Sequence, residues 1–139
     1  MLKRMFSFLL SLVLVTTLCG ATYAVEDRAS KTLSSYEVSC KAGSESGKLQ
    51  FTYDVRAKSL ADSVGIESIA LYSSGGVYMT TILGSTENGL IKSNRLSCIG
   101  DYFHTAVSGN SYYAIITVFA EIDGEYDSKK VSTEVVTAP

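Results

Sequence analysis

The chain has 139 residues, with 12 Lys and Arg against 14 Asp and Glu and a formal net charge of −2. This length suits one domain. The basic residues are scattered, which argues against a nucleic-acid-binding protein, because contact with a phosphate backbone needs clustered Lys and Arg.

Residues 1–24 have the pattern of a secretory signal. Lys3 and Arg4 give a basic start, an apolar run follows over residues 6–18, and small residues end the segment. The run contains hydroxyl side chains and is shorter than the about 18 uninterrupted apolar residues that a membrane-spanning helix needs. We therefore predict cleavage after Ala24 and a secreted, extracellular protein with no membrane span once the signal is removed.

Loss of the signal removes Cys19 and leaves Cys40 and Cys98. An even number of cysteines in an oxidising compartment usually pairs, so a Cys40–Cys98 disulfide is predicted. The alternative is two separate buried thiols, because an unpaired cysteine behaves as a small hydrophobic residue. Two cysteines and the single histidine, His104, do not supply the four ligands of a zinc site, and no cofactor is predicted.

The first part of the expected mature chain divides into a polar segment and two strands. Residues 25–33 carry no apolar period and predict a flexible lead-in to a domain that spans residues 34–139. Apolar and polar residues then alternate over residues 36–42 and 49–56, which predicts two half-buried strands.

The middle of the chain predicts a short helical turn and a hairpin. Residues 59–63 suit one helical turn, which Gly65 would end. Aromatic and β-branched residues predict strands over residues 66–72 and 77–83, joined by a turn at residues 73–76.

Residues 84–110 have weaker patterns. We expect a loop over residues 84–89, one strand near Leu96 in a segment with no single period, a strand over residues 102–107 and a turn at residues 108–110.

The most regular alternation follows, over residues 112–121, and both of its faces are largely apolar. The Asp123-Gly124 pair predicts a hairpin turn, and residues 130–136 predict the returning strand. About seven or eight short strands separated by turns predict an all-β protein that forms a single sandwich of antiparallel strands.

Two resemblances refine this prediction. The arrangement Gly109-x-x-Tyr112-x-Ala114-x-Ile116-x-Val118-x-Ala120 resembles the sixth strand of immunoglobulin-like and fibronectin type III domains. Tyr112 then resembles the tyrosine corner of these domains, whose hydroxyl bonds to the backbone a few residues upstream.

The order of the strand Gly47-Lys48-Leu49-x-Phe51, the strand Gly65-Ile66, the strand Tyr112-Tyr113-Ala114 and the hairpin Asp123-Gly124 is similar to small uncharacterised secreted proteins of Gram-positive gut bacteria. This resemblance implies a stand-alone, secreted immunoglobulin-like β-sandwich and implies no activity. The chain differs from the immunoglobulin-like and fibronectin type III superfamilies in having no Trp. Cys40 and Cys98 also do not match the usual immunoglobulin bridge.

Enzyme chemistry finds little support in the sequence. A hydrolytic site would need His104 within reach of a nucleophilic Ser and an orienting carboxylate, and nothing near it in the sequence supplies them. We therefore predict a protein without catalytic residues.

An acidic group surrounds the predicted Asp123-Gly124 turn. Glu121, Asp123, Glu125 and Asp127 are weak candidates for a calcium site, because calcium prefers oxygen ligands. The alternative is a solvated hairpin tip in which Asp-Gly supplies the positive φ angles.

Tyrosine is abundant, with 9 residues. Exposed Tyr often marks a recognition surface, although Tyr also packs well on an ordinary sheet. The leading hypothesis is a module that binds an unknown protein or glycan through its loops. The alternatives are a structural component of the cell surface that self-associates through an edge strand, and a calcium-dependent adhesion domain.

Overall fold

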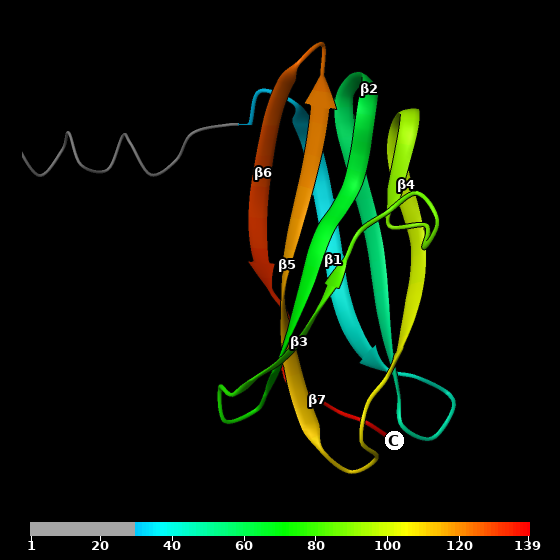
Figure 1. Ribbon diagram of the computed structural model, residues 1–139, viewed down its shortest axis with the longest axis vertical. Helices are drawn as coiled ribbons and strands as arrows, with labels where there is room; N and C mark the ends of the chain where they lie inside the picture. The colour runs from blue at the N-terminus through cyan, green and yellow to red at the C-terminus, as the bar shows by residue number, and fades with distance from the viewer. Residues whose placement is uncertain (1–29) are drawn as a thin grey trace, which may run out of the picture.

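The computed structural model describes residues 30–139. These residues contain no helix and form seven strands (Figure 1): β1 Leu33–Ala42, β2 Lys48–Ser73, β3 Tyr78–Leu83, β4 Ile91–Thr105, β5 Ser111–Ile122, β6 Glu125–Ser132 and β7 Val136–Thr137. Every strand pair is antiparallel. The all-β prediction is confirmed. The predicted signal and the first part of the lead-in, residues 25–29, lie outside the described residues.

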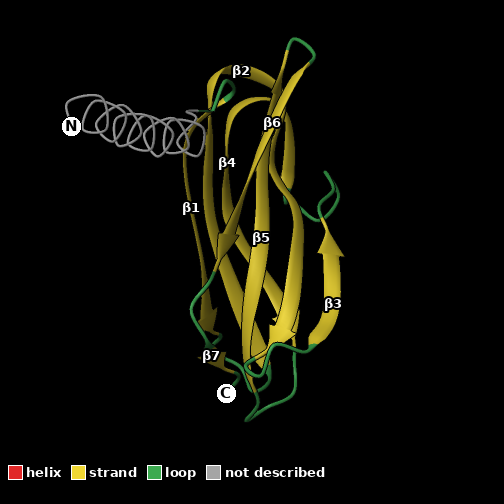
Figure 2. Ribbon diagram, turned by 90° about the vertical axis from the view of Figure 1, so that its left-hand side faces the viewer, coloured by secondary structure: helices red, strands yellow, loops and turns green. Residues whose placement is uncertain are grey.

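The long strands β2 and β4 connect the two layers of the fold. The first half of β2 pairs with β1 on one side and with the second half of β4 on the other. The second half of β2 pairs with β3 on one side and with β5 on the other, and β6 pairs with the far side of β5. Figures 1 and 2 show β2 and β4 bending over at one end of the molecule, so that one sheet folds back on itself as a β-sandwich.

A register shift accompanies the bend of β2. The partners of β2 on β4 change register between Arg56 and Ala61, where β2 carries more residues than β4. Such an irregularity kinks a strand and increases its twist. The predicted helical turn over residues 59–63 is therefore wrong, because these residues continue β2.

Two predicted strand boundaries are also corrected. The strands expected at residues 49–56 and 66–72 are one strand, β2, and β4 likewise joins the two strands expected near Leu96 and over residues 102–107. At both bends several successive residues are exposed, which interrupts the alternation that marks a half-buried strand.

The Asp123-Gly124 turn lies where it was predicted, and the returning strand begins earlier than the sequence suggests. Asp123 and Gly124 have φ angles of 50° and 81°, and Ile122 pairs directly with Glu125 across this two-residue turn. The returning strand is β6, not the predicted residues 130–136. Polar side chains fill the start of β6, so it shows no apolar alternation.

The core lies between the two layers and draws on both halves of β2 and on β5. Its fully buried side chains include Leu49, Phe51, Val55, Val64, Ile66, Ile69, Leu71, Ile116 and Val118. Packing of these apolar groups away from water is the main force that holds such a fold together.

The end of the expected lead-in belongs to the folded domain. Ser30, Thr32 and Leu33 are buried, and the Lys58 N–H donates a hydrogen bond to the Thr32 carbonyl at 2.8 Å. The prediction of a flexible lead-in over residues 25–33 is therefore wrong for residues 30–33. These residues are held by hydrogen bonding of their backbone to β2 near its bend.

Candidate binding surfaces

The predicted disulfide is absent, because Cys40 and Cys98 are both free and buried. Cys40 lies on β1 opposite Phe51, whereas Cys98 lies on β4 opposite Val55, on the other side of β2. Strands are about 4.8 Å apart, so two strands that flank a third lie about 9.6 Å apart, beyond the about 7 Å that a disulfide spans between Cα atoms. The alternative of two separate buried thiols describes the structure.

Burial also suppresses the reactivity of these thiols. It raises the pKa of Cys40 and of Cys98 to about 11, and the nearby Lys92 charge offsets only part of this rise for Cys98. Only the deprotonated thiolate acts as a nucleophile or a metal ligand. Both cysteines stay protonated at neutral pH and are therefore unreactive.

The four calcium candidates do not converge. Glu121 pairs with Tyr126 and Asp127 with Ala120, at adjacent positions of the β5–β6 hairpin, so Glu121 and Asp127 face opposite sides of the sheet. Among residues 30–139, no group of three or more His, Cys, Asp and Glu is placed to hold a metal ion.

Local hydrogen bonds account for the carboxylate of Asp127. Asp127 accepts the backbone N–H groups of Lys31 and Ser128, and a hydrogen bond with Ser30 is the main cause that lowers its pKa. Asp123 sits at the exposed turn, where its backbone N–H donates to the Asp62 carboxylate at 3.1 Å, and Glu125 follows that turn. The region is a solvated hairpin tip.

His104 lies on β4 opposite Leu49 and is half-buried. Its pKa is lowered by burial and then by the positive charge of Lys48. A catalytic histidine is instead supported by a carboxylate that stabilises its charged form. The surroundings of His104 therefore suit a neutral strand residue.

Three tyrosines form a row across β3, β2 and β5. The rings of Tyr72 and Tyr113 are stacked with centroids 5.3 Å apart, and Tyr78 meets Tyr72 edge to face at 5.8 Å. These cross-strand contacts hold Tyr72 and Tyr113 half-buried, while Tyr78 stays exposed. Tyr72 and Tyr113 therefore take part in ordinary packing between strands, and only the ring of Tyr78 is accessible to a partner.

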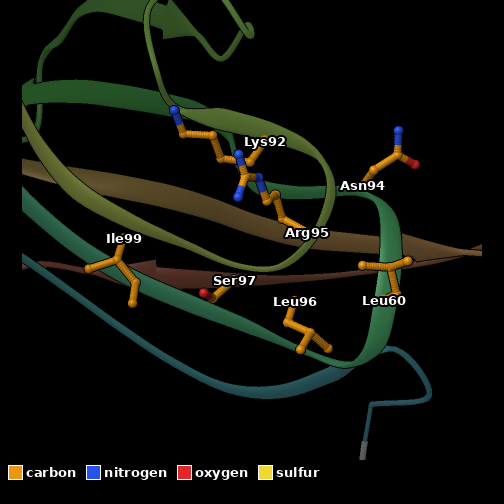
Figure 3. Close-up of a pocket in the computed structure, with 7 residues that line it drawn as sticks. All are labelled: Leu60, Lys92, Asn94, Arg95, Leu96, Ser97 and Ile99. Carbon is orange, nitrogen blue, oxygen red and sulfur yellow. The ribbon is translucent and has the colours of Figure 1, made fainter.

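A groove of about 550 Å³ lies beside the bend of β2 and β4 (Figure 3). Three of its aliphatic side chains are more than half exposed: Leu60 at 63%, Leu96 at 57% and Ile99 at 56%. The other lining residues are Lys92, Asn94, Arg95 and Ser97, and in the view of Figure 3 Lys92 and Arg95 lie above Leu96 and Ile99.

The two cations of the groove are free to meet a ligand. Within residues 30–139, neither Lys92 nor Arg95 makes an ion pair, and no acidic residue lines the groove. The sequence prediction missed this surface, since residues 90–99 show no single period. The signal in the sequence is Leu96 directly after Arg95, an aliphatic residue beside a cation in a segment without an apolar period.

No family model matches the chain, and no curated protein matches it. Among solved structures, the crystal structure of a family 76 glycoside hydrolase from a bovine Bacteroides thetaiotaomicron strain is similar, with a TM-score of 0.45 and 16% identity over 77% of this chain. The match spans 20% of that protein's length. No helix of residues 30–139 is long and apolar enough to cross a membrane.

Proposed function

We propose that this protein is a secreted, non-enzymatic binding module whose ligand docks in the groove beside the β2–β4 bend. The observation that supports this proposal is the groove itself, where three exposed aliphatic side chains accompany two unpaired cations. Exposed apolar surface next to charged groups is typical of a recognition site. Secretion rests on the signal pattern of residues 1–24.

The charge of the groove favours an acidic ligand. The whole chain has a net charge of −2, yet Lys92 and Arg95 give the groove the opposite sign. Complementary charge raises the association rate and selects among partners. An anionic group on the ligand would therefore lie against Lys92 and Arg95.

The aliphatic lining favours a polypeptide over a glycan. Burial of Leu60, Leu96 and Ile99 against apolar groups of a ligand would stabilise the complex by about 25 cal/mol per Å² of apolar surface buried. A glycan presents mainly hydroxyl groups and would leave much of this surface without a matching partner. The ligand class that fits both features is an acidic protein segment with aliphatic side chains.

A fluorescent peptide of alternating Glu and Leu tests this function by anisotropy. We expect it to bind, and we expect added salt to weaken the binding because exposed charges are screened. The double substitution Lys92→Glu and Arg95→Glu should weaken binding by about tenfold or more. The matched control is Lys41→Glu with Lys130→Glu, which changes the net charge equally at exposed positions of β1 and β6.

Four results would count against the proposal. Equal binding of a Lys-Leu peptide, or equal loss of binding in the control variant, would show that the groove charges do not select the ligand. Tighter binding of a hyaluronan oligosaccharide would point to an acidic glycan instead. Absence of binding by every probe would remove the groove as a ligand site.

A further inference from the structure

We infer that β3 is a docking edge at which a second copy of this chain adds an antiparallel strand. Within residues 30–139, β3 pairs only with β2, so its other side has no strand neighbour. Figure 2 shows β3 at the outer edge of the sandwich. A strand in this position presents backbone N–H and C=O groups that can pair with another chain.

The sequence of β3 lacks the usual protection against such pairing. Residues 68–86 contain no charged residue and no proline. Within β3, Leu83 is 71% exposed and Tyr78 is 55% exposed, and Met79 is also exposed. Proteins usually guard an edge strand with charges, proline or a cover, because an open apolar edge associates with other chains.

Among residues 30–139, the longer edges on β1, β4 and β6 carry that protection, and the edge strand β7 has only two residues. Exposed charges occur on β1 at Glu37 and Lys41, on β4 at Lys92 and Arg95, and on β6 at Glu125. Charged side chains of this kind are a usual protection of an edge strand. Among the edge strands of the described residues, β3 is therefore the one best suited to self-association.

The absence of charge favours a second copy as the partner. Two copies of an acidic protein repel each other over most of their surfaces, and an uncharged strand lets them meet without like charges in opposition. A two-fold pair of β3 strands is also self-complementary, as a symmetric dimer interface requires.

The faces of β3 restrict the register of such a pair. Thr81 and Leu83 pair with Ala70 and Ser68 of β2 on the outer face, while Ile82 pairs with the buried Ile69. Antiparallel partners share a face, so a pair centred on Thr81 keeps both faces in register. It sets Thr81 against Thr81, and Ile82 against Thr80 of the second copy.

Sedimentation and cysteine cross-linking test this interface. The purified protein should shift from monomer to dimer as its concentration rises. Thr81→Cys should give a disulfide-linked dimer on oxidation, because directly opposite residues lie close enough for this bond. The native Cys40 and Cys98 are buried and do not compete. Ser35→Cys, at an exposed position of the edge strand β1, is the matched control and should give no disulfide-linked dimer.

A charge substitution separates edge pairing from other contacts. Thr81→Lys places two cations in opposition and should return the dimer to monomer at concentrations where the wild type is dimeric, whereas Ser35→Lys should not. Unchanged melting curves for both variants would show that they fold. A wild type that is monomeric at every concentration, a dimer that survives Thr81→Lys, or cross-linking of Ser35→Cys as efficient as that of Thr81→Cys would overturn the inference.

Discussion

At the scale of single residues, Tyr112 links a loop to the core. Its ring is buried at the start of β5, and its hydroxyl accepts a hydrogen bond from the Val107 N–H at 3.1 Å. This is the contact that a tyrosine corner makes with the backbone upstream of it. The bond satisfies the Val107 donor in the turn that leads from β4 into β5.

Replacement of Tyr112 by Phe should remove this bond and keep the ring. We expect the free energy of unfolding to fall by about 1 kcal/mol, the usual net contribution of one hydrogen bond. Urea denaturation followed by circular dichroism measures the change. Tyr36→Phe, at an exposed position of β1, is the control and should leave stability unchanged. Equal stability of the two variants would contradict a stabilising role for the bond.

At the scale of elements, the turn between β5 and β6 sets their register. Positive φ angles at both Asp123 and Gly124 give a two-residue turn whose twist suits a hairpin. Ile122 and Glu125 pair directly, and the ladder continues to Ile115 and Ser132. A Cβ at Gly124 would meet no atom within 4 Å, so there is room for a side chain. Glycine is favoured at this position only because of its positive φ angle.

Gly124→Ala should therefore destabilise the protein through backbone strain. We expect the free energy of unfolding to fall by about 1 kcal/mol, because a side chain disfavours this φ of 81°. Thermal unfolding gives the comparison with Gly75→Ala, at a turn position with room for a Cβ and no positive φ. If Gly75→Ala is as destabilising as Gly124→Ala, the strain explanation fails.

At the scale of the whole molecule, continuous strands hold the two layers together. β2 contributes to both layers, and its two halves supply Leu49 and Phe51 on one side of the core and Ile69 and Leu71 on the other. Cys40 and Cys98 belong to the core as free thiols and form no disulfide between strands. The fold therefore depends on packing and strand pairing.

Dithiothreitol should accordingly leave the melting temperature unchanged. Cys40 and Cys98 should also resist Ellman's reagent in the native protein at neutral pH, because burial raises the pKa of each to about 11 and keeps it protonated. Both should react once guanidinium unfolds the chain. A melting temperature that falls with reductant, or rapid reaction of the native thiols, would contradict this expectation.

Local pattern predicted much of the fold. The alternation around Leu49 and Phe51 and the longer one from Tyr112 to Ala120 indicated strands correctly, because the side-chain period of a strand is a property of neighbouring residues. The Asp123-Gly124 turn was equally readable, since few residues adopt its φ angles. Prediction failed at the bends, where exposed residues interrupt the period.

The sequence by itself thus determined that the domain is all-β, that residues 49–56 and 112–121 lie in strands and where one hairpin turns, since each of these follows from short-range geometry. Only the tertiary structure decided that β2 and β4 cross between the layers, that β1 and β4 separate Cys40 from Cys98, and that β3 lies at an open edge. These features depend on which distant strands become neighbours. That choice is made by burial of the whole core, and no local pattern encodes it.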